Sequence, residues 1–479
     1  MRKSNTAKDA GTVVRQILAS LLALILLAGS LPVLGADAAE PSYIVKYKAS
    51  SIHQPDDGMP FDLVSREEME RLRDADELEW YEENGTAALI DPELPLRQGA
   101  SLFSYSRFDQ WNLKMIGAET AYQMNFLGQG VRVGVIDSGV YAHPDLAANL
   151  VAGHNYTTGA ADPNNTTDNY GHGTKVAGLI AASSKSGYMG VAPGVEIVPL
   201  KVTDEKNNIS IYDICRAIVG GIDDYHCDVL NLSLGTETNY TPLREAIAYA
   251  AEQGVVVVAA AGNKDYLTDS ALRYPAAYDT VIGVGAVDSS GEIFSGSVCN
   301  SSVFLTAPGM YVRSTSCLGG YDDYSTGTSF SAPQVAGAAA VLLGADPSLT
   351  PENIMDLLAE TAADKEPEGW DEQYGYGILS VSGCMTALAA RAAGSDPCVF
   401  CPFTGPAHCL YNNTNADLEC VYLLAEYEET GRLGTVTAQD LTVPAHGIAE
   451  IKIPDGERYG QFVCQPGTMV PLIAARKAS

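Results

Sequence analysis

Basic residues are scarce in this sequence. Its 479 residues include 29 lysines and arginines against 59 aspartates and glutamates, which gives a formal net charge of −30. This balance argues against binding to nucleic acid or to an anionic membrane, and it favours a soluble, self-repelling surface. The length exceeds that of one ordinary domain, so we expect two or three folded units.

Long hydrophobic runs are missing after the first 40 residues. The amino-terminal segment carries four basic residues, an apolar run over 17–27 and small residues at 36–38. This pattern predicts a secretory signal peptide over residues 1–38, with a retained membrane anchor as the alternative. We therefore expect a secreted protein with no membrane attachment after the signal is removed. The sequence leaves retention at the cell surface open.

Cysteines are sparse in the middle of the chain and crowded at its end. The central region holds four, and the last hundred residues hold six: Cys384, Cys398, Cys401, Cys409, Cys420 and Cys464. This shift predicts a separate unit over 395–479, in which β-rich segments between 420 and 464 indicate a small β-sandwich-like fold. The pair at 398 and 401 suggests zinc, but no second tight pair follows it. In an exported chain we expect disulfides or buried thiols instead.

A short unit precedes the central region. Residues 43–47 alternate like a half-buried strand, 66–76 are charged and helix-forming, and 85–90 predict another strand. We expect a small α+β unit over 39–95. Residues 96–107, with their proline, glycine and serine, predict an exposed linker.

From residue 108 to 394, buried strands alternate with helices. Strands are predicted at 131–136, 195–202, 229–234, 255–260 and 281–287, and helices at 173–182, 211–223 and 242–253. Such alternation predicts an α/β fold of three layers, in which a mostly parallel sheet carries helices on both faces. Ligands of such sheets bind at the carboxyl ends of the strands.

Three candidate catalytic residues stand where that rule places a site. Asp137 ends the first strand, His172 lies between glycines at a helix start, and Ser329 lies where a polar loop turns into an apolar helix. Each has a simpler interpretation, as a turn residue, a structural histidine and a helix cap. Their order along the chain, Asp, His and then Ser, is the order of the subtilisin triad.

The surrounding motifs carry a family resemblance. The segments 135–139, 143–146, 171–178, 327–333 and 335–337 resemble those of the subtilisin-like serine proteases. The resemblance covers roughly residues 105–392. It implies a serine endopeptidase that acts on peptides or proteins, requires no cofactor and is made as a zymogen.

The resemblance also implies a role for each site residue. Ser329 would be the nucleophile, His172 the general base and then acid, and Asp137 the group that holds the imidazole. Asn263 matches the side-chain donor of the oxyanion hole. Ser233-Leu234-Gly235 is similar to the edge that pairs with an extended substrate. The unit at 39–95 would be a propeptide that serves as an intramolecular inhibitor and a folding template.

The first specificity pocket departs from the common family pattern. Lys264 stands where the family has a residue at the pocket mouth, and Arg273 stands where a small residue commonly lines its base. Two cations favour substrates with Asp or Glu before the scissile bond, although Asp265 and Asp269 could neutralise them. Asp91 and Glu93, near the linker, are candidates for the residue after which the chain cleaves itself. Glu93 is preferred, because Pro92 has no N–H and restricts the conformation of Asp91.

Calcium and two rival functions stay open. Many relatives bind calcium after the catalytic histidine, but residues 182–187 contain no carboxylate here, so any ion would lie elsewhere, near Asp145 or the loop 162–168. No metal ligand is assigned.

The alternative from another class is a pseudoprotease or surface-binding protein that uses its carboxyl-terminal module. A lipase or esterase is opposed by the triad order and by Ser331, which replaces the last glycine of the nucleophile elbow.

Overall fold

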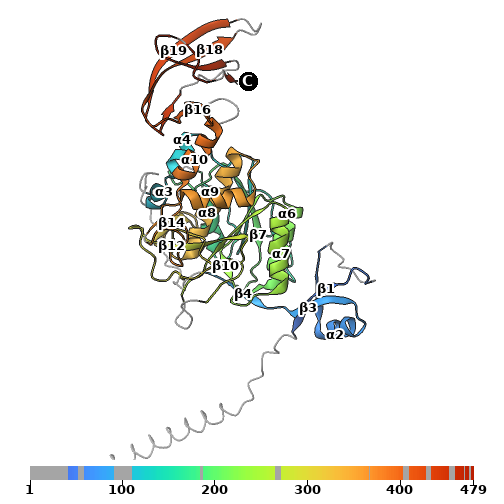
Figure 1. Cartoon of the computed structure of the whole chain (residues 1–479). Helices are drawn as coiled ribbons and strands as arrows, with labels where there is room; N and C mark the ends of the chain where they lie inside the picture. Colours follow the sequence, from blue (N-terminus) through green and yellow to red (C-terminus); the bar gives the residue numbers. More distant parts are fainter. Residues whose placement is uncertain are drawn as a thin grey trace, which may run out of the picture.

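The computed structural model describes most of the chain after residue 40. The described ranges are 41–51, 59–90, 110–183, 187–264, 271–365, 367–402, 409–427, 433–451, 459–468, 470–473 and 476–478. The predicted signal peptide and linker lie outside these ranges. Figure 1 shows three groups of elements along the chain: a small amino-terminal unit, a large central one and a β-rich carboxyl-terminal one.

The central unit is built on a parallel sheet of seven strands in the order β13-β12-β11-β9-β5-β7-β6. The strands are β5 (Arg132–Asp137), β6 (His154–Asn155), β7 (Glu196–Lys201), β9 (Val229–Leu232), β11 (Val256–Ala260), β12 (Val281–Val287) and β13 (Leu305–Pro308). The five strands predicted from apolar runs are confirmed. The sequence pattern missed the short edge strands β6 and β13.

Helices cover both faces of this sheet, so the predicted three-layer α/β fold is confirmed. The central helices are α3 (Trp111–Met115), α4 (Ala118–Gln123), α5 (His172–Ala181), α6 (Ile211–Asp223), α7 (Thr241–Glu252), α8 (Thr328–Ala345), α9 (Pro351–Thr361) and α10 (Val381–Ala393). Successive strand residues point to opposite faces. Val133 and Val135 belong to the apolar cluster that contains residues of α5 and α8, whereas Ile136 belongs to the cluster that contains residues of α6 and α7.

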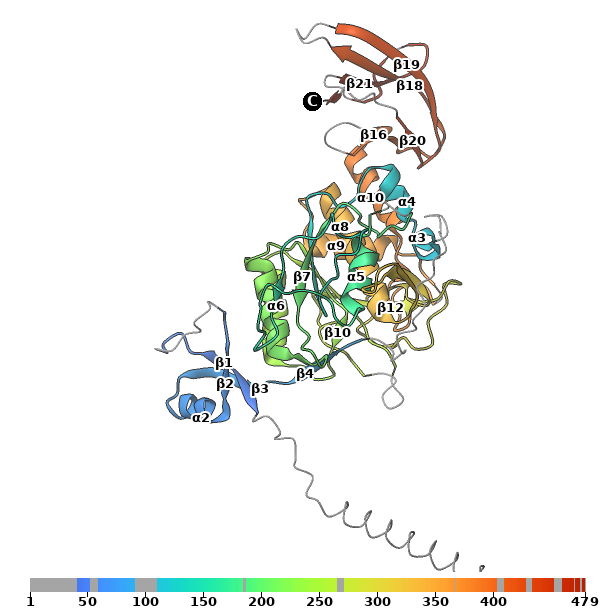
Figure 2. The same cartoon turned by 180° about the vertical axis from the view of Figure 1, so that it is seen from behind.

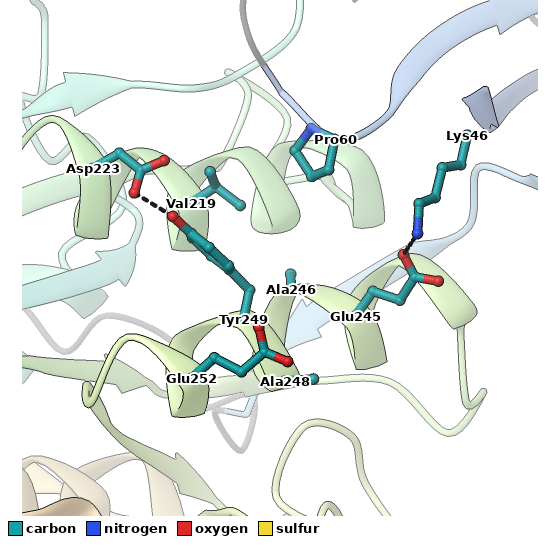
Figure 3. Close-up of a pocket in the computed structure, with 9 residues that line it drawn as sticks. All are labelled: Lys46, Pro60, Val219, Asp223, Glu245, Ala246, Ala248, Tyr249 and Glu252. Atoms are coloured by element: carbon teal, nitrogen blue, oxygen red, sulfur yellow. Dashed lines mark hydrogen bonds and ion pairs between the residues drawn. The ribbon is translucent and has the colours of Figure 1, made fainter. Parts of the chain in front are cut away.

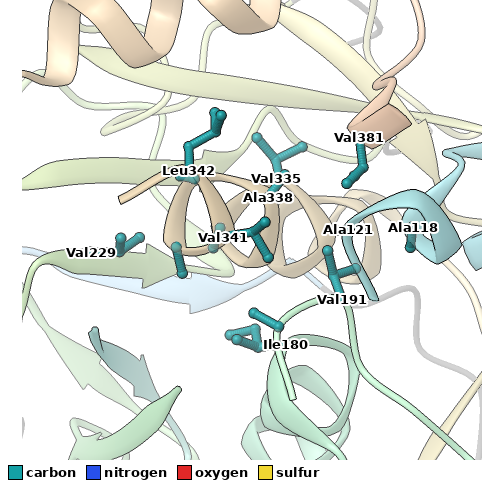
Figure 4. Packing of buried hydrophobic residues seen from close by; sticks show 14 of the residues in the cluster. Ala118, Ala121, Ile180, Val191, Val229, Val335, Ala338, Val341, Leu342 and Val381 are labelled. Carbon is teal, nitrogen blue, oxygen red and sulfur yellow. The ribbon is translucent and has the colours of Figure 1, made fainter. Parts of the chain in front are cut away.

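Helix α8 is the buried centre of one layer. Every side chain from Thr328 to Leu342 is buried, because the helix is apolar or small on all sides and is surrounded by other elements. Val335, Ala338 and Val341 point into a cluster completed by Ile180 and Val191 (Figure 4). The first turn of α8 therefore continues directly into a fully buried stretch of helix.

The amino-terminal unit contains the sheet β2-β1-β3 and helix α2. Its elements are β1 (Ser42–Tyr47), β2 (Asp62–Ser65), α2 (Arg66–Asp74) and β3 (Leu78–Glu83). Strand β4 (Thr86–Leu89) leaves this sheet and pairs antiparallel with β8 (Ile209–Ser210) and β10 (Leu234–Gly235) of the central unit (Figure 2). The sequence pattern missed β2 and β3.

The carboxyl-terminal unit has two antiparallel sheets, β16-β17-β20 and β19-β18-β21-β22. Its strands are β16 (Cys398–Cys401), β17 (Cys409–Asn412), β18 (Leu418–Tyr427), β19 (Leu433–Val443), β20 (Ile448–Glu450), β21 (Tyr459–Cys464) and β22 (Arg476–Ala478). A hairpin of β14 (Val312–Thr315) and β15 (Tyr321–Ser325) belongs to the central unit. The domain boundaries given above stay predictions.

Two cysteines of this unit lie in its core as thiols. Cys398 and Cys420 belong to one apolar cluster with Phe400 and Tyr422. Burial raises the pKa of Cys398 to about 12 and that of Cys420 to about 11. Both are therefore protonated near neutral pH, a state that does not attack a disulfide.

No helix in the described ranges has the length and apolar character that crossing a bilayer requires.

The burial of α8 gives a test of the core. Leu342→Ala removes a fully buried side chain, so we expect it to lower the free energy of unfolding by about 2–5 kcal/mol. Leu318→Ala, at a side chain that is 71% exposed, should change it by less than about 0.5 kcal/mol. Urea unfolding of both variants in a Ser329→Ala background, which prevents self-digestion, checks this. Equal effects of the two substitutions would contradict the packing described.

Candidate active site

The candidate residues gather at the carboxyl edge of the sheet. Asp137 is the last residue of β5, Ser233 follows β9, and Asn263 comes shortly after β11. Parallel strands end at a common edge, so three segments far apart in sequence reach one place. Helices α5 and α8 bring His172 and Ser329 to the same edge by their first turns.

Asp137 and His172 form a buried pair. The Nδ1 atom of His172 lies 2.8 Å from Oδ1 and 2.9 Å from Oδ2 of Asp137, and both side chains are fully buried. A Cβ at Gly173 would collide with the Gly139 carbonyl oxygen, so only glycine lets the helix start approach β5 this closely. The carboxylate holds the proton on Nδ1, which leaves Nε2 as the basic nitrogen.

Ser329 lies beside this pair at the start of α8. The ring of the next residue, Phe330, has its centroid 5.5 Å from that of His172. The Ser329 hydroxyl donates to the carbonyl oxygen of Ile90 and lies 3.2 Å from that of Ser233. The ring contact of its neighbour thus places Ser329 at the same edge of the sheet as the Asp137–His172 pair.

Asn263 faces the same carbonyl oxygen. Its Nδ2 donates to Ile90 O at 3.3 Å. Its Oδ1 accepts hydrogen bonds from the Thr328 N–H at 3.0 Å and the Thr328 hydroxyl at 3.2 Å. Because Thr328 supplies only donors to Oδ1, the amide is oriented with its N–H groups toward Ile90. The sequence motif pointed to Asn263 but gave no role to Thr328.

Ser233, Leu234 and Gly235 pair with the chain's own strand β4. Leu234 is opposite Leu89, Gly235 is opposite Ala88, and the Ile90 N–H donates to Ser233 O at 3.1 Å. The predicted substrate edge thus holds an extended segment, antiparallel to it, which ends at Ser329.

The two predicted pocket cations differ in their surroundings. The guanidinium of Arg273 forms an ion pair with Glu237. Lys264 follows Asn263 and its backbone N–H donates to Gly296 O at 2.7 Å. Asp265 and Asp269, which the sequence offered as neutralising partners, lie outside the described residues. At Arg273 the compensating charge comes from a residue that sequence analysis did not consider.

Asp168 is a buried residue whose role the sequence did not suggest. One carboxylate oxygen accepts hydrogen bonds from Ser138 Oγ at 2.9 Å and from the N–H groups of Tyr170 and Gly171, at 3.0 and 2.6 Å. The other accepts from the Thr174 N–H and hydroxyl. Asp168 thereby caps the helix that begins at His172 and ties it to the loop after Asp137.

This arrangement bears on the calcium prediction. The Asp168 carboxylate is engaged by N–H and O–H donors that a cation would have to displace, and the Asp145 carboxylate accepts the Tyr321 hydroxyl. Within the described ranges, no three side chains of His, Cys, Asp or Glu come close enough together to hold a metal ion. Calcium stays a prediction without an assigned site.

The central unit is similar to a family of peptidases. Residues 128–377 match the Subtilase family of peptidases, and the chain belongs to that family. It is a serine endopeptidase, a hydrolase of peptide bonds, and this family needs no catalytic cofactor.

Several curated proteins are similar to the central unit. Subtilisin DY of Bacillus licheniformis is 37% identical over 281 residues, which are 57% of this chain and 96% of that protein. The minor extracellular protease Epr of Bacillus subtilis (strain 168) is 33% identical over 60% of this chain, but the match spans only 43% of its own length. Fervidolysin of Fervidobacterium pennivorans is 35% identical over 60% of this chain and 45% of its own length.

The role of Asp168 in holding the start of α5 and His172 in place can be tested by measuring the turnover of a variant. In Asp168→Asn an amide N–H group would face donors, so the start of α5 and His172 should shift. We expect kcat to fall about 10- to 100-fold, the usual cost of a displaced catalytic group. Asp162→Asn, at an exposed carboxylate on the same loop, is the matched control. An unchanged kcat in Asp168→Asn, measured per folded molecule on a peptide substrate, would contradict this role.

Proposed function

We propose that the chain cleaves peptide bonds through an acyl-enzyme intermediate formed on Ser329. His172 takes the proton of the Ser329 hydroxyl as the oxygen attacks the carbonyl carbon, and then gives it to the leaving amine. Asp137 stabilises the imidazolium that forms in between. Water, activated by His172 in the same way, releases the acyl group.

Asn263 has the role of oxyanion donor in this proposal. Negative charge develops on the carbonyl oxygen when Ser329 attacks, and a donor already aimed at that oxygen stabilises the charge without reorganisation. The single observation that carries the proposal is the convergence of the Ser329 hydroxyl and the Asn263 amide on one peptide carbonyl, that of Ile90.

Two substitutions distinguish the role of Ser329 as nucleophile from the role of Asn263 as oxyanion donor. Ser329→Ala should lower kcat about 10⁶-fold, and Asn263→Ala about 100- to 1000-fold with little change in KM. A serine-directed fluorophosphonate should label the wild type and Asn263→Ala, but not Ser329→Ala. Ser331→Ala is the control, since its hydroxyl donates to Ala307 O at 2.9 Å, away from the site. Labelling that survives Ser329→Ala would refute the proposed nucleophile, and a wild type that takes no label would favour the pseudoprotease alternative.

We further propose that the amino-terminal unit is a propeptide that inhibits the enzyme and assists its folding. Its inhibitory part is β4, which fills the substrate edge. Its contribution to folding comes from the helix starts that it caps. Glu82 accepts from the Thr241 N–H at 2.8 Å at the start of α7, where the preceding residue supplies no side-chain cap. Asn84 accepts from the Tyr212 N–H at 3.1 Å at the start of α6.

A second contact holds the propeptide against α7. Glu245 accepts hydrogen bonds from Lys46 Nζ at 3.1 Å and from Trp80 Nε1 at 2.8 Å. Figure 3 shows Lys46 beside Glu245, and both line a groove of about 430 Å³ together with Pro60 and residues of α6 and α7. Glu252 lines the same groove about two helical turns further along the same face of α7.

Loss of this contact should speed release of the cleaved propeptide. Glu245→Ala removes the acceptor of two hydrogen bonds, worth about 1–2 kcal/mol in total, so dissociation should be about tenfold faster. The lag before full activity appears, measured after processing, would shorten accordingly. Glu252→Ala is the matched control on the same helix and should keep the wild-type lag. Equal lags in both variants would contradict the contact's role in holding the propeptide.

Secretion belongs to the same proposal. The predicted signal segment lies outside the described residues, and the name of the similar Epr protein describes it as extracellular. N-terminal sequencing of the exported protein tests the signal. Retention at the cell surface and structural calcium are left open.

The preference for Asp or Glu before the scissile bond stays a prediction made from Lys264 and Arg273, and the ion pair of Arg273 with Glu237 counts against it.

A further inference from the structure

We propose that the enzyme processes itself at the bond between Ile90 and Asp91, and that its first specificity pocket selects an aliphatic residue such as Ile90. This inference rests on the proposed function and names the substrate class of the same site.

The first argument is the position of the reactive carbonyl. Ile90 O accepts from both Ser329 Oγ and Asn263 Nδ2, the two groups that the reaction requires at one carbonyl. The strand that leads to it is in register with the substrate edge over successive residues, from Ala88 opposite Gly235 to the Ile90 N–H on Ser233 O. Ile90 is therefore the residue before the scissile bond.

The second argument is the wall of the pocket. Ile90 is only 8% exposed and belongs to the main apolar cluster. Its Cδ1 lies 3.1 Å from the place that a Cβ on Gly235 would take, and Arg273 Cβ lies 3.6 Å from the same place. Arg273 Cγ is 2.7 Å from the corresponding place on Gly262. Glycines and the methylene part of Arg273 thus line the pocket around an aliphatic side chain.

The charge of Arg273 is compensated before any substrate enters. Its side chain is 11% exposed, and its partner Glu237 lies toward the surface at 51%. A carboxylate on the substrate would lose its water in this pocket and meet a guanidinium that already has a carboxylate partner. An acidic residue is therefore disfavoured relative to an apolar one.

The step uses only groups already named. Ser329 Oγ bonds to the Ile90 carbonyl carbon while His172 takes the hydroxyl proton. The bond to the Asp91 nitrogen breaks, and that nitrogen takes the proton from His172. Water then splits the ester, which leaves a carboxylate on Ile90 and a free amine on Asp91.

The sequence had favoured cleavage after Glu93, which lies outside the described residues. Bringing Glu93 to Ser329 would move the strand by three positions. Because strand side chains alternate in direction, an odd shift turns every side chain of β4 to the opposite face.

The bond is tested by sequencing the amino terminus of the processed enzyme. We expect the mature chain to begin at Asp91, and Ser329→Ala to remain unprocessed. Ile90→Val should process normally, Ile90→Glu at least about tenfold more slowly, and Glu93→Gln like the wild type. A mature chain that begins at Leu94 or elsewhere, or faster processing of Ile90→Glu, overturns the assignment.

The pocket is tested on the mature enzyme, so that the result does not depend on folding of a variant propeptide. Quenched peptides with the sequence Ala-Ala-Leu-Xaa-Asp-Pro should show kcat/KM about 100-fold higher for Ile than for Glu at Xaa. Glu237→Gln removes the carboxylate that pairs with Arg273. In this variant the ratio of kcat/KM for Ile to kcat/KM for Glu should fall about tenfold. A preference for Glu or Phe over Ile, or an unchanged ratio, overturns the pocket assignment. Casein hydrolysis and fluorophosphonate labelling report separately on the proposed function.

Discussion

The buried pair of Asp137 and His172 is the constraint on which the rest of the site depends. A carboxylate and an imidazole without water around them are tolerated only when each is held by hydrogen bonds. That requirement explains the glycine at 173, which permits the approach, and Asp168, which fastens the helix start to the loop after β5. Much of the chemistry proposed for Ser329 thus depends on residues outside the proposed catalytic group, such as Gly173 and Asp168.

The parallel sheet brings segments that are distant in the sequence to one edge. Strands β5, β9 and β11 are buried on both faces, so their residues are mostly apolar, with Asn231 inside β9 as an exception. Helix α8 is buried all round and gives Ser329 a rigid support. Precise placement of the hydroxyl follows from packing on every side of the helix.

These features explain what could be predicted from the sequence. Apolar strands, the three-layer fold and the residues Asp137, His172, Ser329 and Asn263 leave a local pattern, because each sits in a short motif at the end of an element. Asp168 and Thr328 leave none, since their contacts depend on the path of a loop and on a neighbour 65 positions away. The ion pair of Arg273 leaves no local pattern either, because its partner Glu237 is 36 residues distant. Long-range pairing of charges is not visible in local composition.

Strand β4 has a consequence for how this enzyme can change over generations. The same chain supplies both the pocket around Gly235 and the segment that lies in it, so the two are inherited together. A substitution that reshapes the pocket for a new substrate meets Leu89 and Ile90 before it meets any other peptide. If the amino-terminal unit is the propeptide proposed above, a change of the pocket would call for a matching change in β4.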